Sequence, residues 1–269
     1  MQDKRGPRGK PGGPKRPAKT DITPEQAGRK RKIEELQRQG LTPALAQGVA
    51  NHQLSLNDAV VRMQRDDEAA RIAQRHGIDH PLAVQIAMGH ADLEVTLTSR
   101  RVAAHLEVNG ERSIFDSRDV AWSVGLYGHA TRPLLFLQND RYEVSVRDAD
   151  VPTAPVEIVH KTHVKYAYLA ADYKLVRKHL EYDKELRAQA TEPRLRPQDR
   201  YACSNRKIGT WWDHKTTVRL KTAEGETFTG EIAWFSRFEV ALKTRAGAEV
   251  VVFRHALADA REARREEKH

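Results

Sequence analysis

The sequence has few of the features that mark secreted or membrane proteins. Its 269 residues include one cysteine, Cys203, so no disulfide can form within the chain, and this usage fits a reducing compartment. No apolar run approaches the ~18–20 residues that a membrane helix needs. The N-terminal charges have no apolar segment behind them. We therefore expect a cytoplasmic protein without a secretory signal and without membrane contact.

Motifs for catalysis and for metal binding are missing as well. The chain has no Gly-rich phosphate loop and no nucleophile elbow. His160 and His163 are close in sequence, but no third ligand with suitable spacing accompanies them. We expect a protein that is not an enzyme and that uses neither a metal nor a cofactor.

The positive charge is concentrated at the N-terminus. Of the net charge of +9, residues 1–32 carry +8, from eleven Lys and Arg against three Asp and Glu, which leaves about +1 for the rest. Residues 1–22 are rich in Gly, Pro and basic residues, which predicts a disordered tail. Such tails often contact nucleic acid, and a tail that only aids solubility is the alternative. The candidate contacts are Lys4, Arg5, Arg8, Lys10, Lys15, Arg16 and Lys19.

Residues 23–108 carry a helical pattern with an internal repeat. The segment that begins Gly40-Leu-Thr-Pro-Ala-Leu aligns with the segment that begins Gly77-Ile-Asp-His-Pro-Leu, at an offset of 37 residues. The repeat predicts two short helical hairpins, with a helix over residues 66–75 between them. This region is either a packing scaffold or a module that binds DNA or a protein partner.

The C-terminal part, residues 199–269, is rich in β signals. Alternation and turns divide residues 217–258 into five short strands, of which residues 256–258 are the last, and residues 260–269 read as a frayed helix. Gly230 in mid-strand suits a sharp bend. Five bent strands in so short a segment predict a small, partly open barrel, which alternation alone would allow to be SH3-like or OB-like.

The residues of this segment resemble a known family. Gly225-x-x-Phe228-x-Gly230 and Phe253-Arg254-His255 are similar in order and spacing to the two Sm signatures of Hfq, the bacterial Sm-like RNA chaperone. The resemblance implies a pocket for an unpaired base. Phe238 would stack on the base, Arg237, Arg254 and His255 would contact RNA, and Gly225 would line the opposite face. The alternatives are that Phe238 is barrel core and that His255 only closes the corner through a backbone hydrogen bond.

Residues 109–168 carry a divergent copy of the same pattern. Arg141-Tyr142-Glu143-Val144 matches Arg237-Phe238-Glu239-Val240 at an offset of 96 residues. The match makes Arg141, Tyr142 and Lys161 the expected counterparts of Arg237, Phe238 and Arg254 as RNA contacts. Between the two copies, residues 169–198 are expected to form a helix, up to about residue 190, and a linker.

The fold class that follows is α+β, with two small five-stranded Sm-like (SH3-like) barrels, an N-terminal helical region and a connecting helix. We expect non-catalytic binding of single-stranded RNA by a post-transcriptional regulator or RNA chaperone. Exposed edge strands would pair between chains and build a ring, such as a pseudo-hexamer of three chains, unless the two barrels pair only with each other. The alternative function is a structural adaptor that assembles through the barrels and binds a protein partner with the helical hairpins.

Overall fold

The computed structural model describes residues 23–189 and 191–263. The chain divides into two compact units, Met1–Asp92 and Leu93–His269. The basic tail, with Lys4, Arg5, Arg8, Lys10, Lys15, Arg16 and Lys19, lies outside the described residues. No helix among the described residues is both long enough and apolar enough to span a membrane.

The first unit is helical and repeats itself. Its helices are α1 (Pro24–Arg38), α2 (Pro43–Ala50), α3 (Leu56–His76) and α4 (His80–Ala87). The 37-residue offset relates α2 to α4 and also relates the start of α3 to the start of α5 (Leu93–Asn109). Each turn between a long and a short helix contains a glycine in the left-handed region, Gly40 with φ +99° and Gly77 with φ +61°. Instead of a helix limited to residues 66–75, α3 is continuous over 21 residues.

The second unit contains all the strands. The first set is β1 (Ala121–Leu126), β2 (Arg132–Asn139), β3 (Glu143–Asp148), β4 (Glu157–His160) and β5 (Val164–Leu169). The second set is β7 (Thr217–Thr222), β8 (Glu226–Phe235), β9 (Glu239–Thr244), β10 (Glu249–Phe253) and β11 (Leu257–Glu262). All pairings are antiparallel, in the order β11-β7-β8-β9-β10-β5-β1-β2-β3-β4, and the short β6 (Glu181–Tyr182) pairs with β8.

The α+β class is as predicted, but the strands form one open sheet rather than two closed barrels. The reason is the pairing of β10 with β5, which joins the two sets edge to edge. Val250, Val251 and Val252 of β10 are each fully buried, so this strand is apolar on both faces. Such a strand is stabilised when side chains of the core pack against both of its faces. Val250 and Val252 pack in one core cluster and Val251 in another, so the seam between the sets contributes to both cores.

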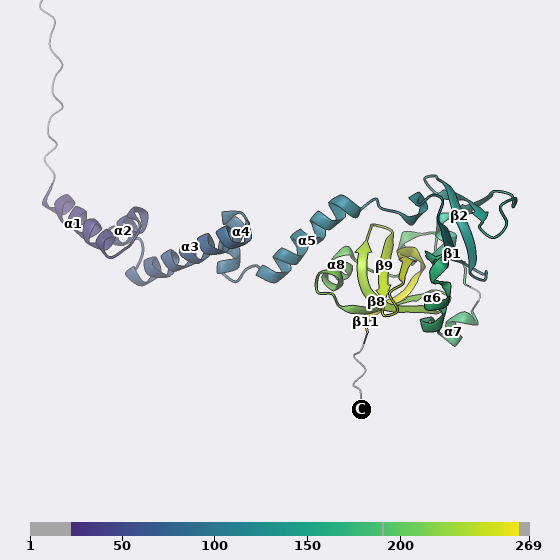
Figure 1. The fold of residues 1–269 in the computed structure, drawn as a ribbon. Helices are drawn as coiled ribbons and strands as arrows, with labels where there is room; N and C mark the ends of the chain where they lie inside the picture. Colours follow the sequence, from purple (N-terminus) through teal and green to yellow (C-terminus); the bar gives the residue numbers. More distant parts are fainter. Residues whose placement is uncertain (1–22, 190, 264–269) are drawn as a thin grey trace, which may run out of the picture. The chain divides into compact units, whose positions relative to one another are not determined.

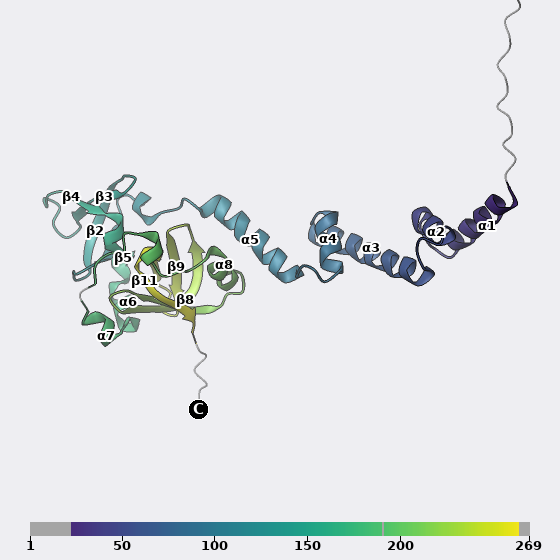
Figure 2. The same ribbon diagram turned by 180° about the vertical axis from the view of Figure 1, so that it is seen from behind.

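Short helices cover the sheet unit. These are α6 (Tyr173–His179), α7 (Lys184–Arg187), α8 (Asn205–Asp213) and the 3₁₀ turns η1 (Ile114–Asp116), η2 (Lys161–His163), η3 (Ala170–Asp172), η4 (Pro197–Asp199) and η5 (Arg254–Ala256). Figures 1 and 2 show β2 and β4 at one end of this unit and α8 at the other. α5 belongs to this unit and is tied to α8 by Arg101, whose Nε lies 2.6 Å from Asp213 Oδ1.

Two local predictions need correction. The segment expected to be one helix over residues 169–190 is broken into η3, α6, β6 and α7, because its apolar stripe is too sparse to bury one long helix. The last strand begins at Leu257 and continues to Glu262, so the described part of the expected C-terminal helix is strand. Backbone pairing with β7 along its length explains why extended structure is favoured there.

Candidate functional site

The two corners singled out from the sequence have the same backbone geometry. The amide of Arg254 donates to the carbonyl of Phe238 at 2.9 Å, and the amide of Lys161 donates to the carbonyl of Tyr142 at 2.8 Å. In each set the basic residue opens the 3₁₀ turn between the fourth and fifth strands. The correspondence inferred between the two copies therefore relates positions that are structurally equivalent, 96 residues apart for Tyr142 and Phe238 and 93 apart for Lys161 and Arg254.

The Arg254 side chain is held by the protein itself. Its guanidinium donates to Asn205 Oδ1 at 2.6 Å, to the Arg237 carbonyl at 3.2 Å and to the Cys203 carbonyl. Burial lowers the pKa of this guanidinium. The group joins the start of α8 to the turn before β9, and its contact with RNA stays a prediction.

His255 also has a partner within the chain. Its Nε2 lies 2.9 Å from the carbonyl oxygen of Val164, at the start of β5. Burial lowers the pKa of His255 to about 4, so the ring is neutral at pH 7. The backbone hydrogen bond considered as an alternative role is present, and it links the two strand sets. No observation here tests contact of this ring with RNA.

The aromatic residues of the corners are open to solvent. Phe238 is 60% exposed and Tyr142 is 61% exposed, so Phe238 is not core. Arg141 Cζ lies 5.1 Å from the centroid of the Tyr142 ring. Arg237 forms an exposed ion pair of 2.7 Å with Glu111. Both rings are free to stack on a base.

Lys161 and Gly225 make contacts within the fold. Lys161 Nζ donates to the carbonyl of Asp140, and burial lowers the pKa of the ammonium group. Gly225 adopts φ +87°, and a Cβ at this position would lie 2.6 Å from the carbonyl oxygen of Asp183. The segment that contains β6 and α7 therefore covers Gly225. The turn requires glycine here because of its positive φ and because of the close approach of the Asp183 carbonyl.

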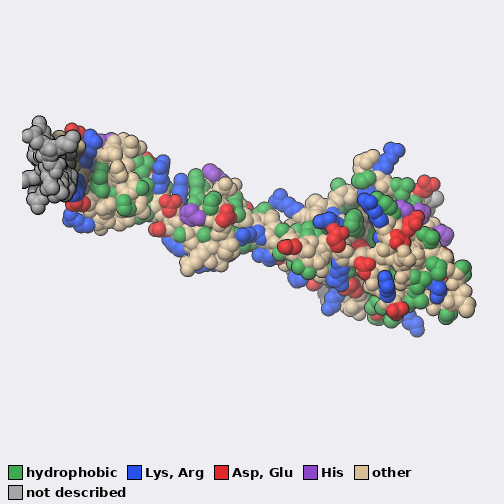
Figure 3. Space-filling model, turned by 90° about the horizontal axis from the view of Figure 1, so that it is seen from above, with side chains coloured by type: hydrophobic (Ala, Val, Ile, Leu, Met, Phe, Trp, Pro, Cys, Tyr) green, Lys and Arg blue, Asp and Glu red, His purple; other side chains and the backbone are tan. Residues whose placement is uncertain are grey.

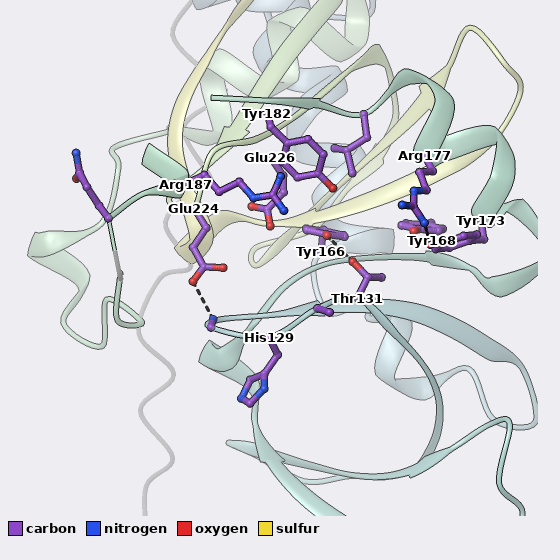
Figure 4. Close-up of a pocket in the computed structure, with 14 residues that line it drawn as sticks. His129, Thr131, Tyr166, Tyr168, Tyr173, Arg177, Tyr182, Arg187, Glu224 and Glu226 are labelled. Atoms are coloured by element: carbon purple, nitrogen blue, oxygen red, sulfur yellow. Dashed lines mark hydrogen bonds between the residues drawn. The ribbon is translucent and has the colours of Figure 1, made fainter. Parts of the chain in front are cut away.

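A hollow at the seam between the two strand sets has the strongest site character. We call this hollow the tyrosine pocket. It has a volume of about 600 Å³, and four tyrosines lie around it (Figure 4). These are Tyr166, Tyr168, Tyr173 and Tyr182. Tyr166 and Tyr168 come from β5 and are 2% exposed, whereas Tyr173 and Tyr182 are 37% and 44% exposed. The pocket thus has a rigid aromatic floor and an accessible aromatic rim.

The floor is fixed by packing and by hydrogen bonding. The rings of Tyr166 and Tyr168 are parallel within 4°, with centroids 6.3 Å apart. Tyr166 Oη lies 2.8 Å from Thr131 Oγ1, a contact visible in Figure 4. Burial raises the pKa of Tyr168 to about 12, so this phenol keeps its proton at neutral pH. His129 also borders the pocket, but its side chain points away from the tyrosines (Figure 4).

Two arginines supply positive charge at the rim. Arg187 Cζ lies 4.3 Å from the centroid of the Tyr182 ring, and Arg177 donates to the Tyr173 hydroxyl. Neither arginine forms an ion pair with a residue that the structure describes. Both guanidinium groups are therefore able to pair with an anion, as guanidinium groups do with phosphate oxygens.

The acidic residues of the pocket are partly neutralised by one buried lysine. Lys165, which is 1% exposed, donates to Glu226 Oε1 at 2.5 Å and to Glu224 Oε2. Glu224 also accepts from the amide of Gly128 at 2.8 Å. One lysine balances one of the two carboxylate charges, so Arg177, Arg187 and Lys165 together exceed Glu224 and Glu226 by one positive charge.

The sequence carries a signal for this pocket apart from the strand pattern and the basic corners. Four of the seven tyrosines fall between residues 166 and 182, and two of them alternate along one strand. Their convergence depends on β5 pairing with β10 and on the bend after β5, which no local pattern specifies.

Charge elsewhere on the sheet unit is mixed. On the face shown in Figure 3, Lys and Arg side chains alternate with Asp and Glu over this unit. Among the described residues, no group of three His, Cys, Asp or Glu side chains is placed to hold a metal ion.

The chain matches no known family model, no curated protein and no solved structure. Its function is therefore inferred from the sequence and the site geometry.

Proposed function

We propose that this protein binds single-stranded RNA without catalysis, as an RNA chaperone or post-transcriptional regulator. The observation that carries the proposal is the tyrosine pocket with Arg177 and Arg187 at its rim. Exposed tyrosine rings stack on unpaired bases of any sequence, and unpaired guanidinium groups attract the phosphates between them. The exposed rings of Phe238 and Tyr142 offer two further stacking positions.

We infer that each five-strand set is an Sm-like module of the kind that the Hfq resemblance implies. Three observations support this inference. The fifth strand lies beside the first in both sets, giving the order fifth-first-second-third-fourth twice. The basic corners have equivalent hydrogen bonds. The contact between the modules joins the fourth strand of one to the fifth strand of the other.

Self-assembly into rings is part of the proposal. The contact between β10 and β5 leaves β4 and β11 as the two ends of the strand order, each without a second strand partner among the described residues. If β4 of one chain pairs with β11 of the next, three chains present six modules in a closed ring. Native mass spectrometry should show three chains, and Ile158→Lys on β4, where Ile158 is 69% exposed, should shift the mass to one chain. Monomer alone at micromolar concentration contradicts this assembly.

The decisive experiment for RNA binding uses a fluorescent single-stranded RNA and the full-length chain. Tyr182→Ala should weaken binding roughly five- to 150-fold, the equivalent of about 1–3 kcal/mol of stacking on one base. Tyr182→Phe keeps the ring and should bind as the wild type does. Arg187→Ala should also weaken binding, whereas Arg118→Ala removes an exposed arginine outside the pocket and serves as the matched control.

A structural adaptor remains the second candidate, because Arg254 and His255 are already occupied by contacts within the chain. A chain that lacks residues 1–22 keeps every described residue and separates the two functions. Binding that persists in this truncated chain and falls with Tyr182→Ala supports RNA recognition by the folded modules. Binding that disappears entirely with the tail favours the adaptor.

A further inference from the structure

A row of side chains crosses three strands of the C-terminal module. Arg261 of β11 lies directly opposite Arg219 of β7, and Arg219 lies directly opposite Thr229 of β8. Residues directly opposite in an antiparallel pair project from the same face of the sheet. Two arginines side by side in this way repel each other, and Glu181, which pairs with Arg219, offsets part of this repulsion.

This row borders a hollow that is separate from the tyrosine pocket. The hollow has a volume of about 620 Å³ and is bordered by residues of α6, of five strands and of the turn after β9. Its histidine, arginine and threonine side chains are those of His179, Arg219, Arg245, Arg261, Thr229 and Thr244. We call it the arginine hollow. Convergence of these groups from different elements creates a concave, donor-rich surface.

The carboxylates of the arginine hollow leave part of its positive charge unpaired. Glu181 pairs with Arg219 at 2.5 Å, and Glu262 accepts from the Trp211 indole at 3.0 Å. Arg245 is exposed and forms no ion pair with any described residue.

The polar atoms of the two facing arginines are also incompletely satisfied. Arg261 has only a longer contact of 3.4 Å, to Asp259. Arg219 Nε is buried and lacks a hydrogen-bond partner within the described part of the chain. An oxyanion in the hollow would supply acceptors to the exposed guanidinium groups of Arg245 and Arg261.

The first strand set, β1 to β5, provides an internal comparison. There the equivalent row is Tyr168, Ser123 and Pro133, paired in the same way across β5, β1 and β2. None of these residues is charged, and Tyr168 belongs to the floor of the tyrosine pocket. The arginines are therefore not required by this position of the module, since the other copy folds with neutral residues in the same register.

We propose that the arginine hollow is a binding site for phosphate groups of the RNA backbone. The inference rests on the proposed function and names the part of the ligand that this second hollow takes. Guanidinium groups bind phosphate oxygens through paired N–H donors, and the threonine hydroxyls add donors at the same surface. The tyrosine pocket would take bases while the arginine hollow holds the phosphodiester chain nearby.

The test compares wild type with the double variant Arg245→Ala/Arg261→Ala in the full chain. For single-stranded RNA, log K falls by about 0.7 per phosphate contact for each tenfold rise in salt. Loss of two contacts should lower that slope by about 1.4 and weaken binding about 25-fold at 0.1 M salt. Arg118→Ala is the control for charge removal. The double variant should melt at or above the wild-type temperature, whereas a purely structural role predicts a lower melting temperature.

A second ligand without bases keeps this proposal distinct from the first. Inorganic polyphosphate should raise the melting temperature of wild type more than that of the double variant. Suppose that Tyr182→Ala loses RNA binding while the arginine double variant keeps the full salt dependence of the wild type. This result overturns the phosphate site and leaves the proposed RNA binding intact. If RNA is not bound at all, the proposed function fails, and the polyphosphate difference then decides whether the hollow takes phosphate from another source. Equal responses of both proteins to both ligands reject the hollow as a site.

Discussion

The ring of Tyr166 occupies the space that a side chain at Gly125 would need. The two residues face each other across the β1–β5 pair, and a Cβ at Gly125 would lie 2.3 Å from Cζ of Tyr166. The floor of the tyrosine pocket therefore depends on a glycine in the neighbouring strand. This contact fixes the height of the ring that a bound base would meet.

Gly125→Ala should destabilise the protein and disturb the pocket together. Overpacking a buried site typically costs about 1–3 kcal/mol, and here the ring has to move for the methyl group to fit. Urea denaturation should show this loss, and RNA affinity should fall under conditions where the variant is still folded. Gly28→Ala is the control, because a Cβ there meets nothing within 4 Å. Unchanged stability of Gly125→Ala would contradict the close contact.

Lys165 should be essential because its ammonium group pairs with two carboxylates in a buried place. Lys165→Met leaves Glu224 and Glu226 without their cation, and breaking a buried ion pair in this way costs about 3–5 kcal/mol. Adding Glu226→Gln to Lys165→Met should restore part of the stability, since one buried charge is removed. Thermal or urea unfolding measures both effects. A double variant less stable than Lys165→Met would argue against this account.

Two buried groups should give opposite pH dependence. Burial raises the pKa of Glu239 from 4.5 to about 7, so its contribution to stability is full below pH 4.5 and is lost as the pH rises to about 7. Burial lowers the pKa of His255 from 6.5 to about 4, so its contribution is full above pH 6.5 and is lost as the pH falls toward 4. Between pH 4.5 and 6.5 the two trends offset each other.

Single variants should expose each trend. Glu239→Gln leaves His255 as the group that titrates in this range. The free energy of unfolding of this variant should therefore fall on acidification from pH 6.5 to 4.5. The fall should exceed that of wild type by up to about 1.4 kcal/mol per pH unit. His255→Asn leaves Glu239 as the group that titrates, so the free energy of unfolding should fall as the pH rises through the same interval. Urea midpoints measured at several pH values test both. Parallel profiles for all three proteins would show that neither group titrates as inferred.

The corner residues should separate binding from stability. Phe238→Leu and Tyr142→Leu remove exposed rings, so each should weaken RNA binding by about 1–3 kcal/mol per stacked base with an unchanged melting temperature. Arg254→Ala removes several hydrogen bonds to the chain and should lower the melting temperature even without RNA. An Arg254→Ala protein with wild-type stability and reduced RNA binding would instead assign this side chain to RNA.

Much of the local structure could be predicted from the sequence. The 37-residue offset marks equivalent helix starts, and the 96-residue offset marks equivalent strands, as β3 and β9 begin at Glu143 and Glu239. These predictions succeed because apolar periodicity and turn residues act over short distances. The predicted helix after Leu169 failed because Val176 and Leu180 pack on the core and β6 pairs with β8, so tertiary contacts outweighed a weak helical pattern.

The candidate site was accessible from the sequence only in part. Phe238 and Tyr142 are exposed, as stacking requires, whereas the half-buried Arg254 guanidinium meets partners up to 51 residues away. The arginine row is visible only after β11, β7 and β8 are placed side by side. Residues from distant segments converge through strand pairing, and no spacing in the sequence records that convergence.

The sequence by itself determined most of the helices and strands, the duplication and the basic corners, because these depend on neighbouring residues. The tertiary structure alone decided that β10 pairs with β5, so that two strand sets share one open sheet. That pairing buries a valine strand on both faces, places the tyrosine pocket at the seam and leaves β4 and β11 at the ends of the strand order. Edge pairing is a long-range contact, stabilised by burial that no single segment can provide.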